Sequence, residues 1–265
     1  MSNIINNHKD IYTAYLSWKN PNKLKNTLDT QKSIIFHTHT SVFFQEISPK
    51  DMELATQYPF INVASSNKNI GIANAFVNLA DDAISLNKKY FMFIENDWEI
   101  HENANYILKY LTLAKNIIDE KNIDLIHLRH SKNPGEPLFC DIDRGTYDKN
   151  NRRKLESRFW QNPATIYPEF VQQEKIGLEN WYFTISKHQN WTNNPFICSI
   201  DFLKKILSTI KQSSIFQEDN LSNTQKYRGL EDTISGFDNW HKHNYKIAAS
   251  NRGLFTHMGD RKRKH

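Results

Sequence analysis

Short apolar segments alternate with helix-like patterns through the first half of this 265-residue chain, and that alternation constrains the fold more than any other feature. The apolar segments are rich in branched and aromatic residues, which predicts strands at 11–17, 33–36, 60–64, 90–94 and 124–128. Apolar residues at helical spacing predict helices between them, at 21–31, about 49–55, 70–86 and 103–119. Strands joined by helices form right-handed βαβ crossovers, so we expect an α/β fold with a mostly parallel central sheet flanked by helices.

The second half of the chain is less regular. Residues 131 to about 178 are polar and turn-rich, and we expect them to form long loops over the sheet. The patterns beyond them predict a strand, two helices and a closing strand, at 181–186, 199–211, 229–243 and 245–249. No internal repeat or linker is visible, so we expect a single domain over residues 1–265.

Composition excludes several classes of protein. Aromatic residues make up 12% of the chain, which argues against intrinsic disorder, and two cysteines are too few for a disulfide scaffold or a four-thiolate zinc site. No apolar run approaches the roughly 18 residues of a membrane span, and the polar segment 1–10 lacks the apolar core of a secretory signal. We therefore expect a cytoplasmic protein.

Polar clusters follow three of the predicted strands, at 17–20, 65–69 and 95–97. In an open α/β sheet, ligands bind outside the carboxyl ends of the strands, so these clusters are candidate ligand contacts. Glu95 and Asp97 are the most informative, because two carboxylates just past a wholly apolar strand cost desolvation energy unless a cation compensates them. A hard divalent ion would do so while leaving sites for phosphate oxygens. The alternative is a surface turn in which Asp97 caps the following helix.

Five segments spread over roughly residues 11–258 carry short motifs in a particular order. They are 15–24 with 27–28, 69–71 with Asn78, 90–97, 229–232 and 254–257. In this order they resemble an inverting GT-A glycosyltransferase of the family 2 kind. The first is similar to the family's opening strand and turn, the second to its Asn-x-Gly…Arg-Asn segment, and the third to the strand that delivers its DxD metal motif. The last two resemble its acceptor-side Glu-Asp motif and its C-terminal metal-binding histidine.

The resemblance implies a GT-A fold, with a nucleotide-sugar-binding half and an acceptor-binding half. These halves would cover about 11–130 and about 131–258, and 259–265 would form a basic tail. The residues that the resemblance assigns to donor binding are Ser17, Trp18, Lys19, Asn67, Asn69, Gly71, Asn78, Glu95 and Asn96.

The implied reaction moves a sugar from a nucleoside diphosphate donor to an acceptor hydroxyl, with inversion. Mn²⁺ or Mg²⁺ held by Asp97 and His257, with Glu95 as a further ligand, would act as a Lewis acid on the leaving diphosphate. Carboxylate plus imidazole suits Mn²⁺ in particular. Asp232 is the expected general base and Glu231 the second choice. The alternative for this pair is an acidic first turn that interacts favourably with its helix dipole.

The chain departs from the family pattern at three places. Glu95 stands where the first Asp of the DxD motif is usual, and its longer side chain can instead reach a ribose hydroxyl or water. Residues 37–40, placed at the end of the predicted second strand, replace an Asp followed by Gly or Ser, so no nucleobase preference is implied. Val77 replaces an Arg, so the diphosphate is expected to rely on Lys19, Lys68 or the metal.

Two other functions compete with this one. A nucleotidyltransferase shares the parallel sheet and an acidic metal site, but no Gly- and basic-rich triphosphate loop occurs early in the chain. A non-catalytic module for polyanions or nucleic acid would use the basic run 261–264, which supplies much of the net charge of +5, but it leaves the clustered carboxylates unexplained. We therefore expect a nucleotide-sugar donor and a hydroxyl acceptor such as a glycan, no nucleic acid, and at most a weak contact of the tail with a membrane surface.

Overall fold

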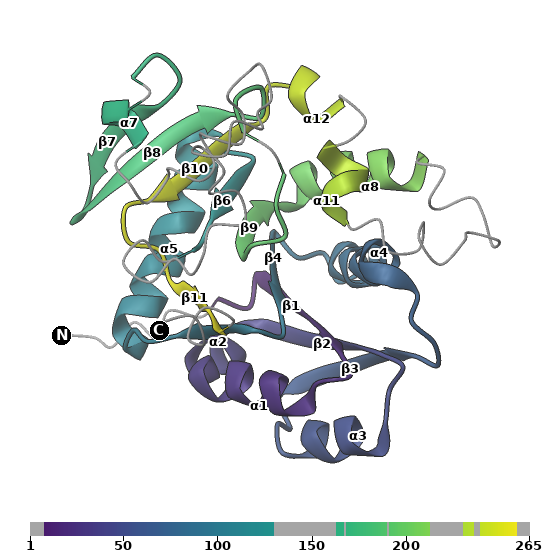
Figure 1. The fold of residues 1–265 in the computed structure, drawn as a ribbon. Coiled ribbons are helices and arrows are strands. Elements are labelled where there is room, and N and C mark those ends of the chain that lie inside the picture. The colour runs from purple at the N-terminus through teal and green to yellow at the C-terminus, as the bar shows by residue number, and fades with distance from the viewer. Residues whose placement is uncertain are drawn as a thin grey trace, which may run out of the picture.

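The computed structural model describes residues 8–129, 163–166, 168–189, 191–212, 230–235 and 239–258. A mixed sheet of nine strands crosses this described part of the chain (Figure 1). From one edge to the other its strands are β3 (Ile61–Ser66), β2 (His39–Gln45), β1 (Ile11–Trp18), β4 (Tyr90–Glu95), β9 (Phe196–Ser199), β6 (Leu125–His127), β10 (Lys246–Ser250), β8 (Glu179–Ile185) and β7 (Gln172–Ile176). Because β9 comes from the second half of the sequence and lies between β4 and β6, the two halves share one sheet.

Four neighbouring strands, β3, β2, β1 and β4, run parallel. Their carboxyl ends therefore lie at one edge, where Trp18 of β1 is in register with Gln45 of β2, and Leu16 with Glu95 of β4. The rest of the sheet is mixed, because β9 runs antiparallel to both of its neighbours and β8 runs antiparallel to β10 and β7. The predicted α/β class is confirmed, with the parallel strands concentrated in the N-terminal half.

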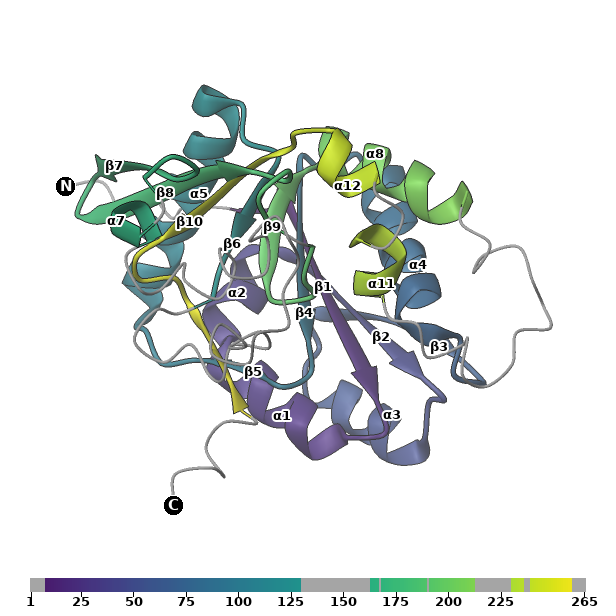
Figure 2. The same ribbon diagram turned by 45° about the horizontal axis from the view of Figure 1, so that its top comes forward.

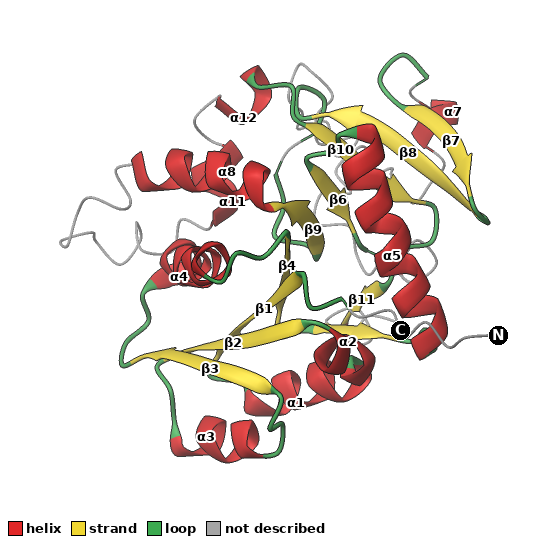
Figure 3. Ribbon diagram, turned by 180° about the vertical axis from the view of Figure 1, so that it is seen from behind, coloured by secondary structure: helices red, strands yellow, loops and turns green. Residues whose placement is uncertain are grey.

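Helices cover both faces of the sheet because successive side chains of a buried strand point to opposite faces. Ile11 and Tyr15 of β1 pack on one face, whereas Tyr12, Ala14 and Leu16 pack on the other. The first face is covered by α1 (Pro21–Thr30), α2 (Lys32–His37), α3 (Pro49–Thr56) and α5 (Ala104–Lys121), and the second by α4 (Gly71–Ser85), α8 (Ile200–Gln212), α11 (Leu230–Ser235) and α12 (Asn239–Lys242). Figure 3 shows α5 lying along the strands of the C-terminal half.

The strand predicted at 33–36 is wrong, because this segment belongs to helix α2. A run of four apolar residues is too short to show a period, so its length alone suggested a strand. In the helix, Ile34 and Ile35 both face the core, and the hydroxyl of Thr38 donates to the carbonyl of Ile34 at the helix end. The second strand is β2, which begins at His39, so residues 37–40 precede or open this strand and do not end it.

Three further predictions for the second half need correction. Within the segment predicted as loops, residues 172–176 form the strand β7, whose polar sequence gives no apolar alternation. The helix predicted at 229–243 consists, where the chain is described, of two short helices, α11 and α12. The strand predicted at 245–249 is β10, but it lies between β6 and β8 and does not close the sheet. The short helix α7 (Pro163–Ile166) was not predicted, and the basic tail 259–265 lies outside the described residues.

A second, two-stranded sheet lies beside the first. Its strands are β5 (Trp98–Ile100) and β11 (Phe255–His257), which pair antiparallel with His257 opposite Trp98. Figure 2 shows this pair beside α1, at the end where β4 leaves the main sheet. None of the helices in the described ranges has the length and apolar character needed to cross a membrane.

Candidate active site

The carboxyl ends of β1 and β4 meet at the edge of the parallel strands. Ser17 is buried, and its hydroxyl accepts a hydrogen bond of 3.3 Å from the side-chain amide of Asn96. Glu95 ends β4 and Asp97 follows two residues later, so the apolar strand delivers two carboxyl groups to this edge. These residues lie at the carboxyl ends of parallel strands, the edge at which α/β sheets commonly bind ligands.

The two-stranded sheet brings Asp97 and His257 together across 160 residues of sequence. The pairing of His257 with Trp98 sets the histidine beside the residue that follows Asp97, and the backbone N–H of Met258 donates to the Asp97 carbonyl at 2.8 Å. The His257 Nε2 atom then lies 3.1 Å from the Asp97 Oδ2 atom. The imidazole is also held against the Trp98 ring, with ring centroids 5.0 Å apart.

Lys23, in the first turn of α1, approaches the same carboxylate. Its Nζ atom lies 3.7 Å from Oδ2 of Asp97. Burial alone would raise the pKa of Asp97, but the hydrogen bond from His257 and the charges of His257 and Lys23 hold that pKa below its ordinary value. Asp97 is therefore an ionised carboxylate beside the His257 imidazole and the Lys23 ammonium.

Glu95 has the opposite environment. Burial raises its pKa to about 8, and the nearby carboxylates of Asp97 and Glu231 act in the same direction. Glu231 belongs to α11, and its Oε1 atom accepts a 2.7 Å hydrogen bond from the backbone N–H of Asn193. The structure thus brings Glu231 within electrostatic reach of Glu95. Asp232 is the next residue of α11, and its side chain lies outside the described atoms.

A second polar group lies at the ends of β1 and β2. Lys19 and Glu46 form an ion pair there, and the Trp18 indole N–H donates to Glu46 at 3.4 Å. Both residues of the ion pair adopt left-handed backbone, with φ of 49° and 53°, which is uncommon for residues other than glycine and concentrates at functional sites. The hydrogen bond from Lys19 lowers the pKa of the Glu46 carboxyl. Trp18 is 42% exposed, so its ring is open to a ligand at this edge.

The remaining residues predicted to bind the donor follow β3. Gly71 opens α4 with a φ of 80°, and its N–H donates to the Asn69 side chain at 2.8 Å, which shapes this turn. Asn67 is exposed in the bend after β3. Asn78 is exposed and donates to the Asn74 carbonyl at 2.8 Å. Because it lies seven residues beyond Gly71, about 10 Å along the helix, the structure does not bring Asn78 to the other residues predicted to bind the donor.

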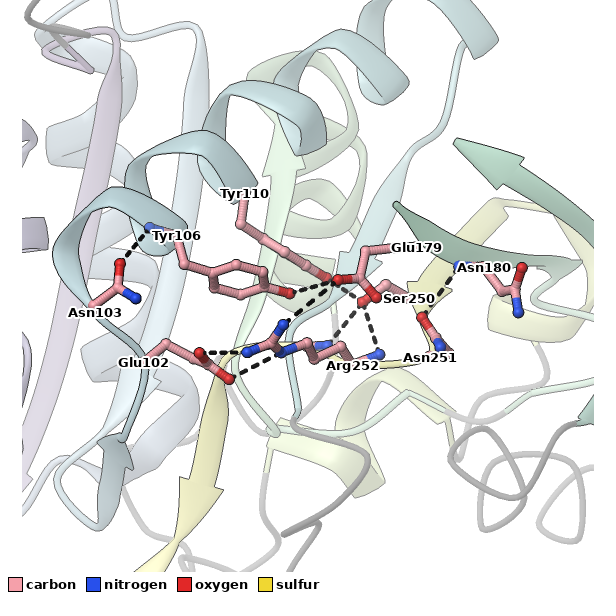
Figure 4. A network of polar contacts seen from close by, with 10 residues as sticks. Glu102, Asn103, Tyr106, Tyr110, Glu179, Asn180, Ser250, Asn251 and Arg252 are labelled. Carbon is pink, nitrogen blue, oxygen red and sulfur yellow. Dashed lines mark hydrogen bonds and ion pairs between the residues drawn. The ribbon is translucent and has the colours of Figure 1, made fainter. Parts of the chain in front are cut away.

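A polar network holds the connection between β10 and β11, which leads to His257 (Figure 4). Arg252 makes a bidentate ion pair with Glu102, at 3.0 and 2.7 Å, and its guanidinium stacks 4.1 Å from the centroid of the Tyr106 ring. The Tyr106 hydroxyl donates to Glu179 at 3.1 Å, and Ser250 accepts the backbone N–H of Arg252. Since Glu102 follows β5, the network ties together the chain segments beside the β5–β11 pair.

Helix α1 holds the other strand of that pair. The Thr27 hydroxyl donates to the Asn96 carbonyl at 3.0 Å, and the buried Gln31 amide donates to the Trp98 carbonyl at 2.8 Å. The Tyr15 hydroxyl of β1 in turn donates to Gln31 at 2.7 Å. Hydrogen bonds therefore hold the backbone on both sides of Asp97, and the one from Gln31 is buried.

Sequence reasoning missed three residues of this site. Lys23 lies just after the predicted turn at Pro21. Its side chain lies near Asp97 only because of the face that α1 buries, which the sequence does not reveal. Glu46 was missed because β2 was placed at the wrong residues. Arg129 ends the β6 segment beside the site, with its guanidinium 5.4 Å from the Trp98 ring centroid, and no motif pointed to it.

The side chains of Asp97 and His257 suit a divalent cation. Two ligand atoms bound at right angles, each about 2.1 Å from an octahedral ion, lie about 3.0 Å apart, and the Oδ2 and Nε2 atoms are separated by 3.1 Å. Glu95 does not complete a protein cage with them, because the described residues contain no group of three His, Cys, Asp or Glu side chains that could hold an ion. The pair therefore fits an ion that takes its other ligands from phosphate oxygens and water.

No protein-family model matches this sequence, and no curated protein matches it. Among solved structures, S. aureus TarS 1–349 is similar over 93% of this chain and 60% of that chain, with 10% sequence identity and a TM-score of 0.53. The same TarS segment in complex with UDP matches at 11% identity and a TM-score of 0.51, over 93% of this chain and 59% of that chain. This chain thus spans about 60% of the length of those structures, and it has the GT-A fold of glycosyltransferases.

Proposed function

We propose that this chain of GT-A fold is a glycosyltransferase, which moves a sugar from a nucleoside diphosphate donor to an acceptor hydroxyl by metal-assisted single displacement with inversion. The observation that carries the proposal is the meeting of Asp97 and His257 at the ligand-binding edge of the sheet, where Glu95 and Glu231 lie close by. Two residues that are 160 positions apart converge there on one cation-sized position.

The donor nucleotide would lie over the ends of β1 and β2. The exposed ring of Trp18 offers a flat surface for a base, and the Glu46 carboxylate beside it offers hydrogen-bond acceptors. Ser17 and Asn96 hold the neighbouring strand ends together, between this surface and Asp97. UDP is the first nucleotide to test, because the similar TarS structure contains it.

Asp97 and His257 would hold Mn²⁺ or Mg²⁺. The bound ion would supply Lewis-acid stabilisation of the charge on the leaving diphosphate. The acceptor hydroxyl must lose its proton as it attacks, and we assign this proton to Asp232, with Glu231 as the second choice. Both residues lie on α11, and the hydrogen bond from the Asn193 backbone fixes the Glu231 side chain near Glu95.

The test combines nucleotide binding with sugar transfer. Purified protein with Mn²⁺ should bind one nucleotide from a panel of UDP, GDP and dTDP sugars, and should slowly hydrolyse that donor. Asp97→Ala should lower nucleotide affinity in the presence of Mn²⁺ to its metal-free level. Asp232→Asn should retain binding and slow transfer by roughly 10²–10⁴-fold, and Glu231→Gln tests the second choice of base.

Asp201→Asn is the matched control, because Asp201 is an exposed carboxylate on α8 and should affect neither measurement. Failure of the folded wild-type protein to bind any nucleotide sugar would contradict the proposal. Turnover of a nucleoside triphosphate with a sugar phosphate would instead assign a nucleotidyltransferase. Salt-sensitive binding of nucleic acid without any dependence on divalent metal would assign the non-catalytic module.

A further inference from the structure

An imidazole and an ammonium group converge on one oxygen of Asp97. The His257 Nε2 atom lies 3.1 Å from Oδ2, and the Lys23 Nζ atom lies 3.7 Å from the same oxygen. A divalent cation held by Asp97 and His257 needs this oxygen. The Lys23 ammonium and a bound divalent ion would therefore compete for the same carboxylate oxygen.

The backbone of Lys23 is held in place, whereas its side chain is partly exposed. Asn20 caps α1 by accepting the Lys23 N–H at 3.1 Å, and Pro21 opens the helix. Thr27 and Gln31 fasten the same helix to the segment that carries Asp97. The Lys23 side chain is 43% exposed, so its four-carbon stem can swing from Asp97 toward a ligand above the strand ends.

Charge balance determines where the ammonium goes. Without a divalent ion, the Lys23 ammonium offsets the charge of Asp97, which also lies within electrostatic reach of Glu95, as does Glu231. A divalent ion on Asp97 removes the partner of Lys23 and places two positive centres side by side, which repel each other. A diphosphate that arrives with the ion supplies the missing negative charge, and a lysine is a common phosphate ligand.

We propose that Lys23 is the resident counter-ion of Asp97 and that it transfers to the donor diphosphate when a divalent cation binds Asp97 and His257. This inference rests on the proposed function. It adds a residue that binds the diphosphate, and it couples the release of Lys23 from Asp97 to the binding of the cation. The ion alone binds weakly, because it must displace the ammonium, whereas the ion and the diphosphate together bind tightly. Linkage requires the effect to be mutual, so the ion raises nucleotide affinity by the same factor by which the nucleotide raises ion affinity.

The experiment measures Mn²⁺ binding from the free-ion EPR signal, with and without UDP, GDP or dTDP, and nucleotide binding by calorimetry with and without Mn²⁺. In the wild-type protein the preferred nucleotide should raise Mn²⁺ affinity about tenfold or more. Lys23→Met should bind Mn²⁺ alone several-fold more tightly and the nucleotide with Mn²⁺ several-fold more weakly, so the coupling factor should fall toward one. Lys25→Met is the matched control, because Lys25 lies on the same helix and pairs with Asp29.

The outcomes separate this inference from the proposed function. If Lys23→Met still binds Mn²⁺ and nucleotide with the wild-type coupling factor, the counter-ion role of Lys23 is overturned and the proposed function stands. Weaker binding of Mn²⁺ alone by Lys23→Met overturns it as well, because Lys23 would then assist the ion. If the wild-type protein binds Mn²⁺ but none of the three nucleotides, the proposed function fails and this inference fails with it.

Discussion

Glu95 and Asp97 lie two residues apart, yet their pKa values move in opposite directions. Burial disfavours the charged form of both carboxyl groups. At Asp97 the neighbours His257 and Lys23 more than compensate, whereas at Glu95 the neighbouring carboxylates add to the effect of burial. At neutral pH the pair therefore combines an ionised group, suited to a cation, with a largely protonated group that can donate a hydrogen bond.

Two buried histidines make stability depend on pH. His8 and His127 are 1% and 7% exposed, and burial lowers the pKa of each to about 4, with the charge of Lys115 contributing at His8. The unfolded chain keeps each imidazole near 6.5. Between these values the unfolded state binds protons that the native state does not, so the free energy of unfolding falls as the pH falls from about 6.5 to about 4.

We expect each of these histidines to contribute a slope of about 1.4 kcal/mol per pH unit within that window. His127→Phe should remove one such contribution, as measured by urea unfolding at a series of pH values. Above pH 7 the imidazole is neutral in both states, so the curves of the variant and the wild type should run parallel there. An unchanged slope between pH 4 and 6.5 would show that His127 is not responsible, and His8→Phe repeats the test at the other site.

At the scale of elements, the connection from β10 to β11 decides where His257 lies. The Arg252–Glu102 ion pair and the Tyr106 ring hold that connection against α5. Arg252→Gln should loosen it and lower nucleotide affinity in the presence of Mn²⁺ several-fold. The free energy of unfolding should fall by only about 1 kcal/mol or less, because the arginine side chain is 39% exposed and its ion pair is screened by solvent.

Lys121→Gln is the control for this variant. It breaks another partly exposed ion pair, with Glu174 on β7, at a distance from His257 along the sheet. Calorimetric titration of UDP and Mn²⁺ into both variants separates a positioning role from a general loss of stability. Equal losses of affinity in the two variants would contradict the positioning role of Arg252.

At the scale of the whole molecule, an aromatic cluster joins the two halves of the sequence. Phe76 of α4 contacts Phe91 and Phe93 of β4, and also Trp191 and Phe196 from the second half, with ring centroids 5.2 to 6.5 Å apart. Phe76→Ala should destabilise the protein by about 3–5 kcal/mol. Because the cluster spans both halves, we expect one unfolding transition, coincident by far-UV circular dichroism and tryptophan fluorescence.

Phe60→Ala is the control, because Phe60 is 60% exposed and its truncation should change stability far less. Two separate transitions, of which only one shifts in Phe76→Ala, would contradict the single-domain prediction.

The N-terminal half of the fold could be predicted because its signals are local. β1 is rich in aromatic and branched residues, β4 is apolar up to Glu95, and α4 repeats its apolar residues at helical spacing over 15 residues. The C-terminal half depends on pairing between distant segments. β7 is a polar strand, and β9 is a four-residue strand set between β4 and β6, so neither has a periodic pattern of its own.

The candidate site likewise contains residues that the sequence motifs identified and residues that only the fold reveals. Motif order assigned Asp97 and His257, and the structure brings them together through a strand pair, β5 and β11, that no local pattern predicted. Lys23 and Glu46 could not be found, because their directions depend on the buried face of α1 and on where β2 ends. Residue type and spacing nominate the candidate groups, whereas strand register decides which of these groups meet.

The position of β9 has a consequence for how the protein is made. During synthesis β1 and β4 leave the ribosome early, but the second partner strand of β4 is missing until residues 196–199 follow. An exposed apolar edge strand is a template for pairing with other chains. The strand that ends in Glu95 is thus unprotected while a hundred further residues are added, roughly 5 to 20 s at typical elongation rates. Nascent chains stalled before β9 should accordingly depend most on chaperones that shield strand edges.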